Sequence, residues 1–153
     1  MDLYLLIYIK TMKINFFFTK LFLIFLFLTS SVQANKSSFF LEAKKLFEKD
    51  NFEKSKSLFE KDIVFNPKNE MSYLYLAKIF NKNEKYEEEE INLNNVLLLN
   101  PKNDEALYML ILIKIKQSDY KGVEKLIKQF TLVCDNFCSK GDEIKNKFKK
   151  LTP

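Results

Sequence analysis

The sequence predicts an all-α fold made of stacked helix–turn–helix repeats. The tetrapeptide Asn-Pro-Lys-Asn occupies residues 66–69 and again residues 100–103, a step of 34 residues. Apolar side chains recur with the same step in three sets, which are Phe52, Tyr86 and Tyr120; Phe59, Leu93 and Ile127; and Phe65, Leu99 and Val133. A fixed period of this length, carried by turns and apolar positions together, indicates a repeat array. The 153 residues also include only two Gly and three Pro, which disfavours a turn-rich β protein.

Residues 1–34 are expected to be a targeting segment outside the repeats. A short basic region, an apolar run at residues 21–28 and small residues ending at Ala34 form the pattern of a secretory signal peptide, with Met12 as a possible start. The apolar run is shorter than the about 20 residues of a comfortable bilayer-spanning helix. We therefore expect cleavage before Asn35 and an exported, periplasmic chain. The alternative is an uncleaved N-terminal anchor that holds the domain on the outer side of the inner membrane.

The chain after the targeting segment divides into three units of one period and a final helix. The units span residues 36–69, 70–103 and 104–137, and the C-terminal capping helix spans residues 138–153. Each unit carries two apolar faces at helical spacing. In chain order these faces are Phe39, Ala43, Leu46, Phe47 and Phe52, Leu58, Phe59, Ile63; Tyr73, Leu76, Ala77, Phe80 and Tyr86, Leu93, Val96, Leu97; Leu107, Leu110, Ile111 and Tyr120, Val123, Ile127, Phe130. Each unit therefore predicts a pair of amphipathic helices.

Short polar breaks and a proline mark the ends of these helices. Within the units the breaks fall at residues 50–51, 83–84 and 118–119. Pro101 ends the second helix of the middle unit, because proline has no N–H to donate and disfavours the helical conformation at Asn100.

The last helix is expected to cover the exposed end of the stack. Ser139, followed three residues later by Asp142, matches a capping box and predicts that the helix begins there. Ile144, Phe148 and Leu151 have the spacing of one helical face. That face would pack on the third unit.

The register of these residues resembles that of the tetratricopeptide-repeat family. Its units carry, in order, an aromatic residue, Leu, a small residue, an aromatic residue, later Ala, an aromatic residue and a closing Pro. The second unit matches this pattern with Tyr73, Leu76, Ala77, Phe80, Leu93 and Pro101. The departures are Glu89 at a small-residue position of the second unit, Glu42 in the first, and Ile111, Lys114 and Asp135 in the third. The resemblance covers almost all of residues 36–153 and implies a right-handed α-solenoid.

The residue types argue against catalysis and nucleic-acid binding. The chain has no His, which removes the commonest general base and metal ligand. From Asn35 onward the chain contains 22 Lys and 19 Asp or Glu residues, a weakly basic balance that is not typical of nucleic-acid binders. The acidic run at residues 87–90 falls in the first turn of a helix, where the macrodipole favours negative charge, and one helix cannot surround a cation. We expect no enzymatic activity, cofactor, metal site or small-molecule substrate.

Two cysteines bracket the turn between the third unit and the last helix. Cys134 and Cys138 are four residues apart, and Cα atoms at that spacing in a turn lie within the about 4.4–6.8 Å that a disulfide requires. An exported chain also meets an oxidising compartment. We expect a structural disulfide. A reduced or intermolecular pair and a redox or metal role are the alternatives, and the spacing is not that of Cys-x-x-Cys.

The resemblance implies a non-enzymatic interaction or scaffolding module in the bacterial cell envelope, with a concave groove formed by the first helices of the units. The groove residues that it implies are Phe40, Leu41, Lys44, Phe47, Leu74, Tyr75, Lys78, Asn81, Tyr108, Met109 and Leu112. Phe40, Tyr75 and Tyr108 recur on successive first helices and are expected to be partly exposed.

An apolar or helical peptide is the expected ligand of such a groove. Phe40, Tyr75, Glu105 and Met109 stand where family members that bind acidic C-termini carry their carboxylate-binding residues. The alternative is a homo-oligomer or a subunit of an envelope complex, whose groove is filled by the last helix or by a second copy. Contact with a membrane is expected only through the N-terminal segment, if it stays uncleaved.

Overall fold

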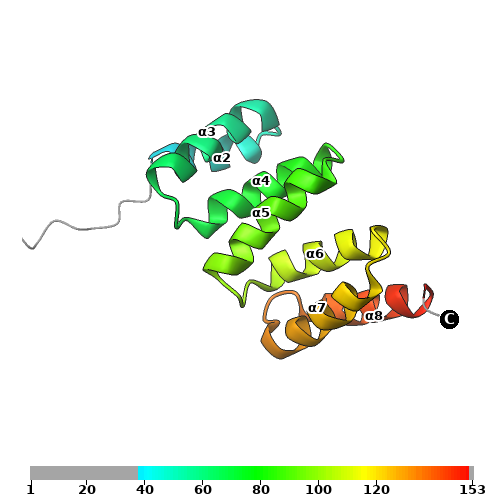
Figure 1. Cartoon of the computed structure of the whole chain (residues 1–153). Helices are drawn as coiled ribbons and strands as arrows, with labels where there is room; N and C mark the ends of the chain where they lie inside the picture. Colours follow the sequence, from blue (N-terminus) through cyan, green and yellow to red (C-terminus); the bar gives the residue numbers. More distant parts are fainter. Residues whose placement is uncertain (1–37, 152–153) are drawn as a thin grey trace, which may run out of the picture. The chain divides into compact units, whose positions relative to one another are not determined.

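A computed structural model describes residues 38–151 (Figure 1). The expected signal peptide, its cleavage before Asn35 and the alternative anchor fall outside the described residues. Residues 36–153 form one compact unit by themselves. Among the described residues, no helix has the length and apolar character needed to cross a bilayer.

The described chain is a succession of helices, which confirms the expected all-α repeat fold. In chain order they are α2 (Ser38–Phe47), α3 (Phe52–Phe65), α4 (Glu70–Lys82), α5 (Tyr86–Leu99), α6 (Asp104–Lys116), α7 (Tyr120–Val133), the 3₁₀ turn η1 (Cys138–Lys140) and α8 (Gly141–Lys149). Over residues 38–151 there is no β-strand. Each expected unit contains two helices, so that α2 and α3, α4 and α5, and α6 and α7 form three stacked hairpins (Figure 1).

The core runs along the stack, because each helix packs against the helix that follows it. Buried apolar residues form three clusters, which are Phe40, Ala43, Phe59, Leu76, Ile79 and Phe80; Leu74, Ala77, Leu93, Val96, Ala106, Leu110 and Ile113; and Leu107, Ile111, Ile115, Val123, Phe130 and Ile144. The clusters join the first hairpin to the second, the second to the third, and the third to α8. Contacts between neighbouring units only are characteristic of repeat arrays.

The first helix of every hairpin ends in the same backbone motif. Asp50, Glu84 and Ser118, again one period apart, have φ angles of 56°, 56° and 57°. In the middle hairpin the Lys85 N–H donates to the carbonyl of Phe80 at 2.9 Å, which is the longer-range bond of a Schellman motif. The motif closes each hairpin turn although none of the three residues is glycine, the residue that tolerates positive φ best.

The joint between the first two hairpins contains a fully buried carboxylate. Asp62 of α3 accepts hydrogen bonds from Nδ2 of Asn66 at 3.1 Å and from Nδ2 of Asn69 at 2.6 Å. The hydroxyl of Ser72 in α4 donates to the same carboxylate. One period later, Val96 holds the corresponding place in the next joint. The polar joint is tolerated because three donors converge on the buried charge.

The start of the last helix differs from the expected capping box. Ser139 lies inside the 3₁₀ turn, and α8 begins only at Gly141. Lys140 therefore occupies the N-cap position, and no side chain caps the helix. The predicted capping box of Ser139 and Asp142 is wrong, because Ser139 lies in the 3₁₀ turn and not at the N-cap position of α8.

The loop between α7 and α8 is closed by a disulfide and tied to α6. Cys134 and Cys138 are joined, with their Cα atoms 5.1 Å apart. Oδ2 of Asp104 accepts hydrogen bonds from the backbone N–H groups of Asp135 and Phe137, both at 2.8 Å. Burial acts to raise the pKa of Asp104, but these backbone hydrogen bonds outweigh it and hold the pKa below the ordinary value.

Candidate functional site

Three residues that were expected to line the groove pack against the part of the chain that follows their own hairpin. Phe40, Leu74 and Tyr108 lie one period apart, each on the side of its helix that faces the next unit. Phe40 meets Tyr75 of α4 edge-on, with ring centroids 6.1 Å apart, and Leu74 packs in a cluster with residues of α6. Phe40 and Leu74 are 8% and 2% exposed. Their assignment to an open groove is wrong, because the next hairpin covers them.

Tyr108 is half-buried beside the C-terminal segment. Its hydroxyl donates to Oε1 of Glu143 in α8 at 3.3 Å, and its ring centroid lies 5.8 Å from that of Phe137. Burial raises the pKa of Tyr108, and the negative charge of Glu143 adds to the increase. The last helix therefore takes up the place beside Tyr108 that a ligand was expected to occupy.

Tyr75 is half-buried and contributes to packing. Its ring stacks on Phe59, with centroids 5.0 Å apart and an interplanar angle of 8°, and meets Phe47 edge-on at 5.0 Å. Lys78 places its Nζ 5.2 Å from the Tyr75 ring centroid. Tyr75 thus holds the first two hairpins together, and the half-buried Phe47 also belongs to this packing.

The residues that remain accessible on the first helices form a mixed surface, which we call the first-helix face: Leu41, Lys44, Tyr75, Lys78, Met109 and Leu112. Leu41 is 46% exposed, whereas Met109 and Leu112 are half-buried. Lys44 pairs with Glu48 at 3.8 Å, and Lys78 of α4 pairs with Glu105 of α6 at 2.8 Å. Lys78 therefore has a close acidic partner, Lys44 makes a longer and exposed contact, and the rest of this face is apolar.

Asn81, another expected groove residue, binds a buried acid of its own hairpin. Its Nδ2 donates to both carboxylate oxygens of Glu89, at 3.0 and 3.1 Å. Glu89 is fully buried, and burial raises its pKa, although Asn81 and the charge of Lys116 act in the opposite direction. The pair explains the acid at a small-residue position, because Glu89 receives a partner within its own hairpin, and it turns Nδ2 of the exposed Asn81 toward Glu89.

A second pair of acid and base links the last two hairpins at the far end of the first helices. Lys114 of α6 donates to Oε1 of Glu90 in α5 at 2.5 Å, and Gln117 donates to Oε2 at 2.7 Å. Burial acts to raise the pKa of Glu90, but the hydrogen bonds from Lys114 and Gln117 lower it below the ordinary value. This contact is structural, because Glu90 and Lys114 bind each other across the boundary between two hairpins.

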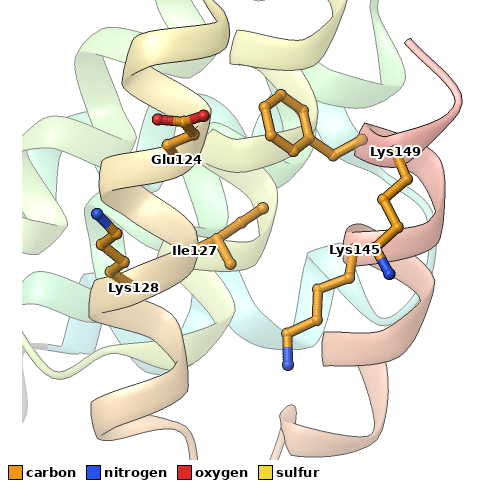
Figure 2. A pocket seen from close by; sticks show the side chains of 6 residues that line it. Glu124, Ile127, Lys128, Lys145 and Lys149 are labelled. Atoms are coloured by element: carbon orange, nitrogen blue, oxygen red, sulfur yellow. The ribbon is translucent and has the colours of Figure 1, made fainter. Parts of the chain in front are cut away.

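The structure also forms a cleft that the sequence analysis missed. This end cleft, with a volume of about 360 Å³, lies between α7 and α8 and is lined by Glu124, Ile127, Lys128, Lys145, Phe148 and Lys149. In Figure 2, Ile127 projects from α7 into the space between the helices, and Lys145 and Lys149 project from α8. The cleft therefore combines an apolar floor with a mainly cationic rim.

The end cleft exists because the third hairpin is followed by a single helix among the described residues. Ile127 is the periodic equivalent of Phe59 and Leu93, which are fully buried under the following hairpin. Ile127 itself remains half-buried. The signal was present in the sequence, because a core position of the last unit had only the final helix to cover it.

The described residues do not form a recognisable metal centre. Nowhere in residues 38–151 do three His, Cys, Asp or Glu side chains come together in a group that could hold an ion. The chemistry that these surfaces offer is apolar contact and ion pairing.

Comparison with known proteins gives matches among solved structures. No family model matches the chain, and neither does any curated protein. The first TPR domain of Spaghetti (RPAP3), bound to the HSP90 peptide SRMEEVD, aligns with a TM-score of 0.66 at 14% identity, over 75% of this chain and 91% of that one. The Arabidopsis OM64 TPR domain aligns with a TM-score of 0.66 at 13% identity, over 74% and 93%. The yeast Sti1 TPR2B domain, in a complex with pHsp70, gives 0.63 at 17%, over 72% and 93%.

At these identities the likeness concerns the fold. The helical hairpins, the 34-residue step and the packing of each first helix on the next are all present in the described chain. The neighbours are covered over nine-tenths of their length. The chain therefore has the tetratricopeptide-repeat (TPR) fold.

Proposed function

We propose that this chain is a non-enzymatic protein-interaction domain that binds an apolar or helical segment of a partner protein. The observation that carries the proposal is the row of accessible apolar side chains on three successive first helices, represented by Leu41, Tyr75 and Leu112. Solved structures with this fold include a Spaghetti domain bound to an HSP90 peptide and a Sti1 domain in a complex with pHsp70. Apolar side chains presented in a row by rigid helices are a suitable surface for a partner helix.

The charges of the first-helix face favour an apolar ligand over an acidic C-terminus. A carboxylate needs lysine or arginine groups that are free to bind it. Lys44 and Lys78 are instead paired with Glu48 and Glu105. Binding through this face would therefore depend on burial of Leu41 and Leu112, and would respond weakly to salt.

The end cleft is a second candidate site on the same domain. Its apolar floor is flanked by Lys128, Lys145 and Lys149, none of which forms an ion pair within the described residues. A helix with one acidic and one apolar face would match it, because it would cover Ile127 and neutralise the lysines.

The two sites can be separated by capture of the partner from the cell envelope with the full chain tagged after Pro153. Leu112→Asp should abolish capture if the partner binds the first-helix face, whereas Lys145→Glu should abolish it if the partner binds the end cleft. Glu88→Lys, on the exposed side of α5, is the control and should retain capture. A partner retained equally by all three variants would refute both assignments. A dimer of the wild type that Leu112→Asp dissociates would favour the self-associating alternative.

We also propose that the domain works in the cell envelope after export. The basis is the signal-peptide pattern that ends at Ala34. The intact mass of protein recovered from the envelope should correspond to a chain that begins at Asn35. Full-length protein in the membrane fraction would favour the uncleaved anchor.

A further inference from the structure

The last helix of the described chain has few features that would keep it folded by itself. α8 is nine residues long and no side chain caps its N-terminus, and isolated helices shorter than about 12–15 residues are marginal in water. Ile144 is its one fully buried side chain. The half-buried Phe148 packs beside Tyr120, with ring centroids 6.1 Å apart. The position of α8 therefore depends on the loop that precedes it.

That loop is held by the disulfide and by one carboxylate acting together. The bond between Cys134 and Cys138 closes a short ring of the chain. Both backbone N–H groups that donate to Oδ2 of Asp104, those of Asp135 and Phe137, belong to this ring. A cross-link limits the conformations that a short segment can adopt. The disulfide thus keeps the two N–H groups directed at one acceptor, which would otherwise have to order a free loop.

The C-terminal segment covers the end of the repeat stack. Ile144 completes the third apolar cluster, in which Leu107, Ile111 and Phe130 are at most 2% exposed. In the first two hairpins the equivalent surface is buried by a whole hairpin, whereas among the described residues α8 and its loop alone cover the third (Figure 1). Separation of α8 would therefore expose an apolar surface of the kind that receives a helical hairpin elsewhere in the stack.

The disulfide can be reached from solvent at one of its two residues. Cys138 is exposed, whereas Cys134 is half-buried against the third apolar cluster. The chain contains these two cysteines only, so that no third thiol of its own can rearrange the bond. Thiol–disulfide exchange requires a thiolate that can approach a sulfur atom. Cys138 provides that access.

We propose that the disulfide of Cys134 and Cys138 is a redox switch for α8. A thiolate of a dithiol reductant attacks Sγ of Cys138, the S–S bond breaks, and Cys134 leaves as a thiolate that takes up a proton. The second thiol of the reductant then displaces Cys138 from the mixed disulfide. The reductant ends as a disulfide, and two electrons and two protons have passed to the two cysteines. The reduced loop loosens, α8 separates from the third hairpin, and Leu107, Ile111 and Phe130 become accessible.

The switch also governs the end cleft, because α8 forms one of its walls. The oxidised chain has the cleft, whereas the reduced chain presents the apolar end of the third hairpin in its place. Separation of α8 can be measured without a partner, so the switch stands apart from the proposed protein-binding function.

Hydrogen exchange of residues 36–153, which form a compact unit by themselves, tests the switch. Addition of dithiothreitol should lower the exchange protection of the α8 amides about 5–30-fold, the upper value being that for a five-residue loop freed from its cross-link. Protection in α2 to α5 should stay nearly the same. Ile144→Ser, which removes the buried anchor of α8, gives the reference for a separated helix in the oxidised protein.

A chain without cysteines is the matched control. Cys134→Ala with Cys138→Ala should show low protection of α8 in the absence of reductant and no response when dithiothreitol is added. In the wild type, alkylation followed by mass spectrometry should find both thiols labelled after dithiothreitol treatment of the folded domain.

Three results would each overturn the switch. Thiols that are labelled only in urea would show that no reductant can approach the disulfide in the folded domain. Unchanged protection of α8 after reduction would show that the disulfide fixes only its own loop. An equal loss of protection in all helices would show that it stabilises the domain as a whole and does not control α8.

Discussion

The buried carboxylate of Asp62 allows a test of how the first two hairpins are joined. In the next joint, Val96 and Ala106 stand one period after Asp62 and Ser72, and both are fully buried in an apolar cluster. Asn103 there caps α6 by accepting a hydrogen bond from the Ala106 N–H at 2.9 Å. Asn69, its equivalent, binds Asp62 instead and makes no such cap. The chain therefore contains the apolar version of its own polar joint.

Asp62→Val alone should destabilise the domain by about 2–4 kcal/mol. It removes three hydrogen bonds to a charged acceptor, although the desolvation of the carboxylate is relieved. The buried Ser72 hydroxyl loses the acceptor for its hydrogen, at a cost of about 1–3 kcal/mol, and keeps only the hydrogen bond that its oxygen accepts from Nδ2 of Asn69 at 3.1 Å. Asp62→Val with Ser72→Ala copies the next joint and lets Asn69 cap α4. The double variant should return to within about 1 kcal/mol of the wild type, with a coupling energy of about 1–3 kcal/mol.

Urea unfolding followed by far-UV circular dichroism, on the wild type, both single variants and the double variant, measures this coupling. Equal slopes of the unfolding free energy against urea would show that the four proteins expose the same surface. Strictly additive effects of the two substitutions would refute the reasoning, because they would mean that Asp62 and Ser72 do not form one network. A double variant less stable than Asp62→Val would refute the equivalence of the two joints.

Three further variants test other features of the stack. Glu89→Gln should raise the urea midpoint at neutral pH, because burial raises the pKa of Glu89 and makes its ionised form unfavourable in the folded state. The gain in stability should shrink toward about pH 4, where the carboxyl group is protonated in the unfolded state as well. A gain that does not depend on pH would contradict this reasoning. Ala77→Leu should destabilise by about 1–3 kcal/mol through overpacking, and Ile111→Ala, at the equivalent site of the third unit, by about 2–5 kcal/mol through a cavity; negligible effects at both sites in the same urea assay would show that the register is wrong. Glu84→Gly should stabilise the domain by up to about 1 kcal/mol, because glycine tolerates the φ of 56° at this position. Glu87→Gly, inside α5, is the control and should destabilise the domain. Melting temperatures of the two variants, compared with the wild type, would show whether the turn is strained.

The architecture could be predicted well from the sequence, because apolar residues and turn residues repeat with the same period, and both depend mainly on local structure. It assigned Phe40 and Leu74 wrongly because an apolar residue at the border of a helix face looks the same whether it faces a ligand or the next helix. Only the placement of the next hairpin decides between the two. The same limit applies to charge: Asp62 and Glu89 look like surface residues until Ser72 and Asn81 are seen to reach them.

The end cleft, finally, concerns the length of the array. Ile127 and Phe148 lie where one more helix would continue the stack, and Lys145 holds the position that the small residue Ala77 and then Ile111 occupy in earlier units. A lysine there keeps the end soluble and discourages another unit from docking. Growth of the solenoid would thus require little more than an apolar residue in place of Lys145 and a further hairpin sequence. The exposed end of the third hairpin is therefore shaped by a single helix face, which evolution or a designer can change without altering the units before it.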